Sequence, residues 1–393
     1  MTGVCILGST GSIGRNCLRV VEGFRNRFRV VSLTAGQNLE LLADQIVKFR
    51  PAMAAVATEN EIGRLRDELR VRGYQDEIEI LGGREGRMAA ATLPEVEIVV
   101  SASAGVTGLV ATYAAVQAGK RVGLANKETL VVAGQLVARE AKKSGANILP
   151  IDSEHCAIHQ CLRSCERNEV ERLILTGSGG PFLNTPLEQF ASITPEQALN
   201  HPIWKMGGRI TVDSATLMNK GLEIIEARWL FGVRPEQIDV VIHPESIIHS
   251  MVEFSDRCLL AQLAVADMRI PIQYALTYPE RAAMDGDSLR LDLTAVNGLH
   301  FRRPDTARFP CLALGRAAIE QGGCAPCVLN AADEVAVGAF LDRGLPFTGI
   351  PRVVESVMRR TPRSTFESIE DVLACDREAR IWAAEAVRAA SGV

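Results

Sequence analysis

Two carboxylates that could share a metal ion follow a short apolar segment near the middle of the chain. Asp152 and Glu154 flank Ser153 directly after residues 148–151, a stretch typical of a β-strand. In extended backbone, residues two apart point to the same side about 6.6 Å apart. Both carboxylates can therefore reach one hard cation such as Mg²⁺ or Mn²⁺. The alternative is an acidic N-cap for the helical segment that follows.

A second polar group falls on a predicted helix. Asn219 and Glu223 are four residues apart and Lys220 is their neighbour, so an amide, a cation and a carboxylate share one helical surface. A solvent-exposed helical face would explain the same residues. The upstream segments 201–209 and 213–214 favour a binding site, because they bring many more hydrogen-bond donors than a structural loop needs.

A glycine-rich loop follows the first predicted strand and opens a helix. Residues 8–14 read Gly-Ser-Thr-Gly-Ser-Ile-Gly, whose spacing is a relative of the dinucleotide-binding fingerprint. Glycines permit a tight turn, and the helix N-terminus favours a pyrophosphate. Residues 34–38, at the end of the second strand, contain no acid to repel a 2′-phosphate, which favours NADP over NAD. They contain no basic residue either, so this preference is moderate.

A second glycine-rich loop, residues 176–181, also follows a predicted strand. It could cradle a phosphate through backbone N–H groups and the Ser178 hydroxyl, or it could act as a mobile hinge beside a site. His155 and His159 are four apart and could ligate zinc, although packing on a helix face or support of the neighbouring site is favoured. For His243 and His249 we expect structural hydrogen bonds.

The elements that must position these groups change in character along the chain. Up to residue 150, β-branched runs alternate with amphipathic helical segments, which predicts an α/β fold class with an N-terminal doubly wound, Rossmann-like domain over residues 1–150. Its predicted strands are 4–8, 28–33, 53–57, 78–81, 96–101, 121–125 and 148–151.

The rest of the chain predicts two further domains. Residues 151–279 form a central α+β catalytic domain that binds metal and substrate, with strands at 172–176, 240–242 and 247–254. Turn signals over 280–310 indicate a linker. Residues 311–393 form a C-terminal four-helix bundle, with helices at 311–321, 327–342, from 350 onward and at 369–390.

Composition limits the partners and the compartment. A net charge near −4 gives no general attraction to nucleic acid or to an anionic membrane, so a small molecule is the expected partner. The chain contains no uncharged apolar stretch of about 18 residues and opens without a signal-peptide pattern, from which we expect a cytoplasmic protein. Cys324-Ala-Pro-Cys327 has the spacing of redox and zinc sites, but no second such pair exists. We therefore expect reduced, structural thiols.

Several longer strings together carry a family resemblance. They are residues 8–14, Ala-Asn-Lys-Glu at 125–128, Ile-Asp-Ser-Glu-His at 151–155, Thr-Gly-Ser-Gly-Gly-Pro-Phe at 176–182 and Val-Asp-Ser-Ala-Thr-Leu-Met-Asn-Lys-Gly-Leu-Glu at 212–223. Over essentially the whole chain the sequence resembles the 1-deoxy-D-xylulose 5-phosphate reductoisomerases. The resemblance implies an NADP-dependent oxidoreductase of isoprenoid biosynthesis by the methylerythritol phosphate pathway. It would isomerise its phosphorylated sugar substrate, by retro-aldol and aldol steps or an α-ketol shift, and reduce it to 2-C-methyl-D-erythritol 4-phosphate.

The resemblance also implies the cofactors and the site residues. The cofactors are NADPH and Mn²⁺ or Mg²⁺, with Co²⁺ possible; a homodimer and sensitivity to fosmidomycin-type hydroxamates are further expectations. The implied metal ligands are Asp152, Glu154 and Glu223, and the implied catalytic residues are Lys127 and Glu154. The implied substrate contacts are Lys127, Ser153, Glu154, Ser178, His201, Ser214, Asn219, Lys220 and Glu223, of which Ser178, His201, Ser214, Asn219 and Lys220 would lie nearest the phosphate. The implied cofactor contacts are Thr10, Gly11, Ser12, Ile13, Gly36, Asn38, Asn126, Glu128 and Gly207.

Trp204 and Met206 would belong to a flap that closes over the substrate, and His249 to the residues that support the site. The sequence departs from the family pattern at Gln37, where a basic residue is frequent and whose change weakens the NADP argument, and at Asp333, where asparagine is usual. Two other readings stay open at this point. A simple NADP-dependent dehydrogenase of the homoserine or semialdehyde type would not need three carboxylates and a phosphate site, and a non-catalytic NADP sensor could dispense with the carboxylates.

Overall fold

The computed structural model describes residues 1–204, 206–284 and 289–391. By its internal contacts the chain divides into two compact units. Unit 1 comprises Met1–Thr129, Val137–Ser153 and Met268–Asp285, and unit 2 comprises Leu130–Leu136, Glu154–Asp267 and Gly286–Val393. Most of the residues predicted as catalytic domain, linker and C-terminal domain fall in unit 2, whereas residues 268–279 fall in unit 1 and Leu130–Leu136 fall in unit 2.

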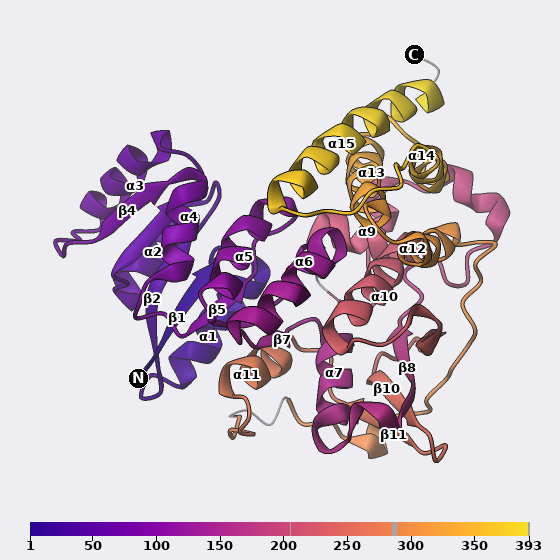
Figure 1. The fold of residues 1–393 in the computed structure, drawn as a ribbon, viewed down its shortest axis with the longest axis horizontal. Helices are drawn as coiled ribbons and strands as arrows, with labels where there is room; N and C mark the ends of the chain where they lie inside the picture. The colour runs from indigo at the N-terminus through magenta and orange to yellow at the C-terminus, as the bar shows by residue number, and fades with distance from the viewer. Residues whose placement is uncertain (205, 285–288, 392–393) are drawn as a thin grey trace. The chain divides into compact units, whose positions relative to one another are not determined.

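Unit 1 is built on a parallel sheet of seven strands in the order β4-β3-β2-β1-β5-β6-β7 (Figure 1). The strands are β1 (Thr2–Leu7), β2 (Phe28–Thr34), β3 (Met53–Val56), β4 (Glu79–Gly82), β5 (Ile98–Ser101), β6 (Arg121–Leu124) and β7 (Ile148–Pro150). The helices are α1 (Ser12–Gly23), α2 (Leu39–Phe49), α3 (Asn60–Val71), α4 (Gly83–Thr92), α5 (Leu109–Gln117), α11 (Arg269–Thr277) and α6 (Glu128–Ser144), of which the stretch Leu130–Leu136 is assigned to unit 2. The predicted α/β fold class is confirmed.

The two faces of this sheet are covered by different helices. Alternate residues of β1, Val4 and Ile6, belong to a buried apolar cluster that also contains side chains of α1, α2, α3 and α11. Because successive strand residues point to opposite faces, Cys5 and Leu7 face the other side, where α4 and α5 pack. On that side the Ser32 hydroxyl of β2 donates to the Ala90 carbonyl of α4 over 2.7 Å. The sheet is thus buried on both faces, as a doubly wound fold requires.

The strand order reverses between β1 and β5, and the loops after these two strands lie together. Gly8 has a φ of +82°, and a Cβ at this position would lie 2.7 Å from the carbonyl oxygen of Ala102. Ligands of doubly wound sheets bind outside the carboxyl ends of the strands at such a reversal. The topology therefore places the first glycine loop where a dinucleotide is normally bound.

Unit 2 contains a four-stranded mixed sheet in the order β11-β10-β8-β9. Its strands are β8 (Val170–Gly177), β9 (Ile238–Ile242), β10 (Ile248–Phe254) and β11 (Leu259–Leu263). β8 pairs with β9 in parallel, whereas β10 is antiparallel to both β8 and β11. The helices α7 (Ser153–Cys161), α9 (Gly208–Thr216) and α10 (Met218–Phe231) carry site residues, and the short helix α8 (Pro195–Ala198) precedes the segment that contains His201.

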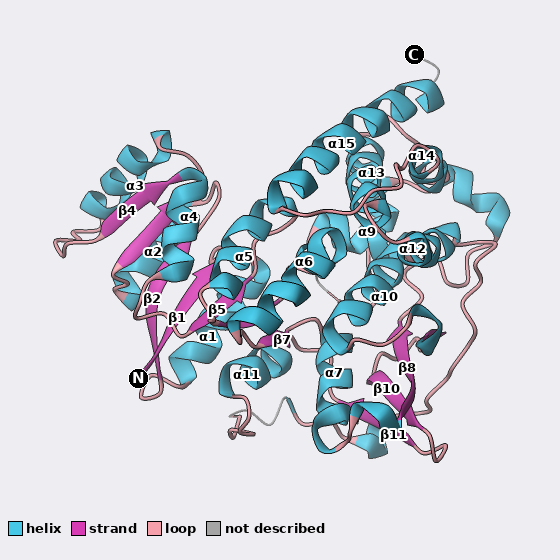
Figure 2. Ribbon diagram, in the orientation of Figure 1, coloured by secondary structure: helices cyan, strands magenta, loops and turns pink. Residues whose placement is uncertain are grey.

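Four helices complete unit 2, in agreement with the predicted C-terminal helical bundle: α12 (Pro310–Gln321), α13 (Ala325–Leu341), α14 (Gly349–Met358) and α15 (Ile369–Ser391). Figure 2 shows them as the helical end of the chain, with α13 packed against both α14 and α15. Within the predicted linker, residues 285–288 lie outside the described part of the chain, and Arg302 forms an isolated antiparallel bridge with Ile242. None of the described helices combines the length and apolar character that crossing a bilayer requires.

Candidate active site

Three carboxylates converge where β7 leads into α7. Asp152 follows the strand, Glu154 lies in the first turn of α7, and Glu223 comes from the middle of α10. One oxygen atom from each lies within 4.8 Å of the others. Glu223 is fully buried, so a charge at this position must be balanced by protein groups or by an ion rather than by water. An all-oxygen group of this kind suits Mg²⁺ or Mn²⁺.

Two lysines balance part of this negative charge. Lys127 Nζ lies 2.8 Å from Asp152 Oδ2, and Lys220 Nζ lies 2.5 Å from Glu154 Oε1 and 2.6 Å from Glu223 Oε2. Burial lowers the pKa of Lys220, but the two glutamates outweigh burial and the pKa is raised. Lys220 therefore stays protonated. Its ammonium group thus occupies the glutamate oxygens that a metal ion would need.

The loop after β8 holds Ser178 with an available proton. The His201 Nδ1 atom accepts hydrogen bonds from the backbone N–H groups of Ile203 (3.2 Å) and Trp204 (2.9 Å). A neutral ring then carries its proton on Nε2 and donates it to Ser178 Oγ over 3.1 Å. Burial lowers the pKa of His201, which favours this neutral form. The N–H of Gly180 also donates to Ser178 Oγ over 3.2 Å, so the serine hydroxyl can donate its own hydrogen to an anion.

The same loop packs closely on the residues predicted to bind phosphate. Gly179 and Gly180 have positive φ angles, and a Cβ on Gly180 would lie 2.6 Å from the backbone oxygen of Ser214 in α9. Lys220 extends along Gly177, at which a Cβ would lie 3.2 Å from its Cε atom, and its ammonium group donates to the Thr176 carbonyl over 2.8 Å. The Ser178 hydroxyl and the Lys220 ammonium group thus lie at the same loop, residues 176–180.

Asn219 is the remaining predicted phosphate contact. Its Nδ2 atom donates to Glu223 Oε1 over 2.5 Å along α10. The amide therefore orients the carboxylate from one side while Lys220 holds the other oxygen. Glu154, Ser178, His201, Ser214, Asn219, Lys220 and Glu223 all belong to unit 2.

The segment predicted to form a flap lies between His201 and α9. The Trp204 ring stands 6.2 Å, centroid to centroid, from the ring of His249, whose pKa is lowered chiefly by burial. Met206 is half-buried, and Gly207 directly precedes α9. Lys205 lies outside the described residues. His243, by contrast, is a structural residue: its Nδ1 atom faces the His300 carbonyl at 2.9 Å, and its Nε2 atom accepts from the Ile247 N–H.

The first glycine loop is held by contacts that leave its tip open. Gly8 donates its N–H to Thr34 Oγ1 over 3.0 Å, and the buried Ser9 hydroxyl donates to Gln45 Oε1 over 2.6 Å. A Cβ on Gly14 would lie 2.3 Å from the Gly8 carbonyl oxygen, so only glycine lets α1 start this close to the loop. The predicted cofactor contacts at the tip, Thr10, Gly11, Ser12 and Ile13, are exposed or half-buried.

The other predicted cofactor contacts have different surroundings. A Cβ on Gly36 would meet no described atom within 4 Å. Asn38 caps α2, since its side chain accepts from the N–H of Leu41. The Asn126 amide donates to the carbonyls of Ser103 and Gly105, and Glu128 lies in the first turn of α6. Asn126 therefore fixes the loop after β5, which packs on Gly8.

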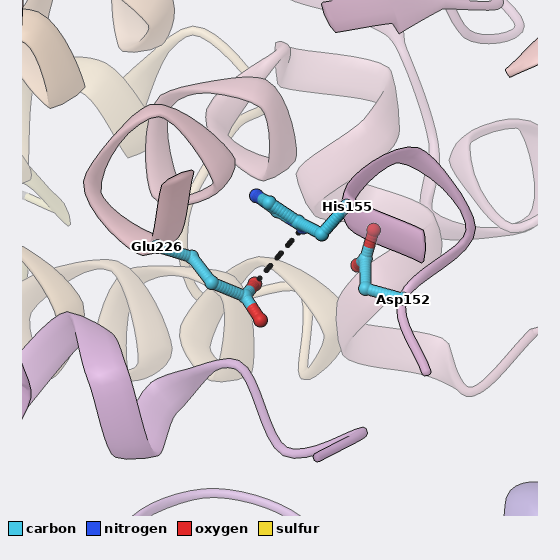
Figure 3. Close-up of side chains that lie close together, drawn as sticks. All are labelled: Asp152, His155 and Glu226. Atoms are coloured by element: carbon cyan, nitrogen blue, oxygen red, sulfur yellow. Dashed lines mark ion pairs between the residues drawn. The ribbon is translucent and has the colours of Figure 1, made fainter. Parts of the chain in front are cut away.

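A second cluster of possible metal ligands, Asp152, His155 and Glu226, shares Asp152 with the cluster of three carboxylates. Figure 3 shows the His155 ring between Glu226 and Asp152, with His155 Nδ1 3.5 Å from Glu226 Oε2. Oxygen or nitrogen atoms of the three side chains lie within 4.8 Å of one another. Because the Glu223 carbonyl must accept, His155 Nε2 donates to it over 2.9 Å. Among the described residues, no such group contains both His155 and His159, as a zinc site built on that pair would require.

Sequence reasoning overlooked several of these residues. Gln45 and the 103–105 loop hold the nucleotide loop, yet they lie far from it in the chain and form no motif. Glu226 had a readable signal, because it lies three residues after Glu223 on the same predicted helix and so on a neighbouring surface.

Comparison with known proteins agrees with this geometry. Residues 4–134 match the family model described as 1-deoxy-D-xylulose 5-phosphate reductoisomerase, and residues 148–231 and 263–382 match two models of its C-terminal domains. The 1-deoxy-D-xylulose 5-phosphate reductoisomerase of Solibacter usitatus is 51% identical over 387 residues, which cover 98% of this chain and 97% of that protein. This chain belongs to the 1-deoxy-D-xylulose 5-phosphate reductoisomerase family.

Further members of the family agree over nearly their full length. The protein of Pelotomaculum thermopropionicum is 51% identical over 389 residues, covering 99% of each chain. A solved structure from Zymomonas mobilis in complex with NADPH has 41% identity and a TM-score of 0.91, covering 98% of this chain and 99% of that one. Another, in complex with NADPH, fosmidomycin and magnesium, has 39% identity and a TM-score of 0.92, covering 99% and 98%. The predicted family resemblance is confirmed.

Proposed function

We propose that this chain converts 1-deoxy-D-xylulose 5-phosphate to 2-C-methyl-D-erythritol 4-phosphate with NADPH and a divalent metal, Mg²⁺ or Mn²⁺, with Co²⁺ as a possible substitute. The observation that carries the proposal is the carboxylate group of Asp152, Glu154 and Glu223 beside a set of phosphate donors. Family membership and the NADPH, fosmidomycin and magnesium bound by a similar structure support it.

The residues present fit a hard divalent ion. Their ligand atoms are carboxylate oxygens, and these lie within 4.8 Å of one another. When bound, the metal would act as a Lewis acid that stabilises negative charge on the substrate's carbonyl and hydroxyl oxygens. Asp152, Glu154 and Glu223 would hold it.

Lys127 and Glu154 would transfer protons to and from the reacting hydroxyl groups. Lys127 is buried and paired with Asp152, so its ammonium group is held in one place as a proton donor. Glu154 is less buried than Glu223 and can accept a proton once Lys220 releases it. Each group is oriented by a charged partner before substrate arrives, which general acid–base catalysis requires. Ser153, half-buried between the two acids, would contact the substrate beside them.

The phosphate would orient the substrate from its remote end. Ser178 and Lys220 offer an O–H and an ammonium group around the 176–180 loop, and Ser214, Asn219 and His201 lie on the segments next to it. Binding energy from a group that does not react can be used to position the group that does. Closure of Trp204 and Met206 over the bound substrate would exclude water from the aldehyde intermediate.

For the nucleotide, the glycine loop and the open start of α1 would bind the pyrophosphate. Thr10, Gly11, Ser12 and Ile13 form the tip of the loop, and Gly36 and Asn38 lie at the carboxyl end of β2, where dinucleotides place their adenosine ribose. Asn126, Glu128 and Gly207 would contact the cofactor as well. NADPH is favoured because residues 34–38 contain no acid that would repel a 2′-phosphate.

The test is NADPH oxidation with 1-deoxy-D-xylulose 5-phosphate, with and without Mn²⁺, followed by mass spectrometry of the product. We expect loss of NADPH absorbance only when both metal and substrate are present, and a product that has gained two hydrogens and carries a branched carbon skeleton by NMR. A metal-independent reduction to an unbranched product would instead identify a simple dehydrogenase.

We also propose a homodimer in the cytoplasm. The exposed edge strand β11 supports the dimer, because Leu259 and Leu260 are about half exposed there and an apolar edge can pair with a second copy. Light scattering should give twice the monomer mass, and Leu259→Lys should give the monomer. The use of NADPH and ten cysteines without a disulfide among the described residues support the compartment, which cell fractionation would test.

A further inference from the structure

Three cysteines form a cluster in the C-terminal helices, away from the carboxylates. Cys324 directly precedes α13, Pro326 lies in its first turn and Cys327 follows, so the Cys-x-x-Cys motif sits at a helix N-terminus. Both thiols are almost fully buried. The Cys324 thiol donates to the Pro362 carbonyl over 3.0 Å.

The third thiol comes from a different helix. Cys375 lies on α15, which packs beside α13 (Figure 1), and its side chain is only half-buried. The Cys327 sulfur lies 3.7 Å from the carbonyl oxygen of Val372, one helical turn before Cys375. Cys327 and Cys324 both lie near enough to Cys375 to lower the pKa of its thiol. The motif and Cys375 thus form one contact group across two helices.

The cluster divides its roles between an accessible sulfur and buried ones. The interaction with Cys327 lowers the pKa of Cys375, despite the opposing effects of burial and of the acids Glu378 and Asp376. The pKa of Cys327 is raised, first by its interaction with Cys375 and then by burial. Peroxides react with a thiolate that they can reach. Cys375 is partly exposed and its lowered pKa increases the fraction of thiolate, while Cys324 and Cys327 are buried beside it.

We propose that Cys375 and Cys327 form a reversible oxidation site, in which a peroxide oxidises Cys375 and Cys327 then closes a disulfide between α15 and α13. In the first step the Cys375 thiolate attacks one peroxide oxygen, the O–O bond breaks, and the leaving hydroxide takes up a proton to form water. In the second step the Cys327 sulfur attacks the sulfenic acid of Cys375, the S–O bond breaks, and a second water leaves with the Cys327 proton. Two thiols are oxidised and one hydrogen peroxide is reduced to two waters.

The rest of the chain supplies a matched control. Cys258 is the most exposed cysteine among the described residues, but Asp256 raises its pKa through a hydrogen bond. Cys5 and Cys17 interact with each other, yet both are fully buried. Exposure alone therefore predicts attack at Cys258, and thiol proximity alone predicts a Cys5–Cys17 bond. The proposed site requires both properties, which Cys375 combines.

The experiment treats the full-length protein with limiting hydrogen peroxide, alkylates the remaining thiols and maps peptides by mass spectrometry. We expect the loss of two alkylation sites per chain, a cross-linked peptide pair containing Cys327 and Cys375, and full reversal by dithiothreitol. Oxidation of Cys258 before Cys375 would overturn the proposal. Formation of a disulfide between other cysteines before the Cys327–Cys375 disulfide would overturn it as well. This readout uses the unaltered protein, so it does not depend on a variant that folds.

Two variants sharpen the result. Cys375→Ser should retain all its other free thiols under the same treatment, and Cys327→Ser should leave a Cys375 sulfenic acid that dimedone captures. A Cys324–Cys375 disulfide in the second variant, formed at the wild-type rate, would show that Cys327 is not the reacting partner and overturn its assignment. Circular dichroism of both variants checks the fold. None of these measurements uses reductoisomerase activity, so the outcome is separate from that of the proposed function.

Discussion

Two clusters of possible metal ligands share Asp152, and the same glutamate-to-glutamine substitution at two positions can distinguish them. Glu223 and Glu226 lie three residues apart on α10, and both are fully buried. Glu223 belongs to the group with Glu154, and Glu226 to the group with His155 (Figure 3). Glutamate to glutamine keeps the size of the side chain and removes its charge. Glu223→Gln and Glu226→Gln therefore form a matched pair.

The expected magnitude follows from burial. Water cannot replace a ligand at Glu223, and its two oxygens are already held by Asn219 and Lys220. Removing one member of a buried, compensated charge group costs about 3–5 kcal/mol. We expect Glu223→Gln to weaken Mn²⁺ binding by about two to three and a half orders of magnitude, at about 1.4 kcal/mol for each factor of ten. NADPH affinity should be nearly unchanged, and turnover should be lost.

Glu226→Gln should behave differently if the metal binds where the three acids converge. It removes the partner of His155 without removing a ligand, so we expect a change in Mn²⁺ affinity of about tenfold or less, within the range of residues that support a ligand. Isothermal titration with Mn²⁺ measures the affinity, and the fluorescence of bound NADPH reports the cofactor. Strong loss of Mn²⁺ binding in Glu226→Gln with normal binding in Glu223→Gln would refute this reasoning and assign the ion to the histidine group.

Three further predictions address the lysine, the nucleotide loop and acid stability. Lys220→Met removes the ammonium group that occupies two metal ligands. Titrations of the apo-protein should therefore show at least about tenfold tighter Mn²⁺ binding, together with weaker binding of the substrate phosphate. Unchanged Mn²⁺ affinity would contradict a competition between Lys220 and the metal for the glutamates. Gly14→Ala places a methyl group 2.3 Å from a backbone oxygen and should destabilise unit 1 by about 1–3 kcal/mol and weaken NADPH binding, whereas the control Gly63→Ala meets no described atom within 4 Å and should not; equal melting temperatures would count against the close approach. Burial lowers the pKa of His159 from 6.5 to about 4, so the unfolded chain takes up this proton at a higher pH than the folded one. The corresponding stability is complete above pH 6.5 and falls as the pH decreases to about 4, by at most about 3–4 kcal/mol. In urea titrations His159→Asn should lose this part of the pH dependence, and an unchanged slope would disprove it.

Local pattern was enough to predict the strands of unit 1 and the four C-terminal helices. Each strand there is a short β-branched run between amphipathic helices. The repeated alternation of strand and helix then places each strand beside a parallel neighbour in the sheet. β11 was not predicted, because Leu-Leu-Ala-Gln-Leu contains no β-branched residue and its pairing with β10 depends on a turn. α11 shows a related limit. Ile272, Ala275 and Leu276 pack in the core of unit 1, but their periodicity cannot reveal that the chain returns to that unit.

The candidate site also contains residues that local motifs predict and contacts that they do not. Asp152, Glu154 and Glu223 were recognisable because each lies in a short motif whose spacing has a chemical meaning. The ion pair between Lys220 and Glu154 joins residues 66 apart in the chain, and the same lysine was predicted only as a phosphate contact. A single ammonium group with two sets of possible partners cannot be assigned from spacing, because which partner it takes depends on what else is bound.

This double use of Lys220 has a thermodynamic consequence. Its ammonium group cannot neutralise Glu154 and Glu223 and also pair fully with a phosphate. A phosphate that draws Lys220 away leaves the two glutamates with less compensating charge, which raises their affinity for a divalent cation. By linkage, the cation must then raise the affinity for the phosphate by the same factor. The structure therefore leads us to expect that metal and phosphorylated substrate assist each other's binding, and that this mutual effect disappears when methionine replaces Lys220.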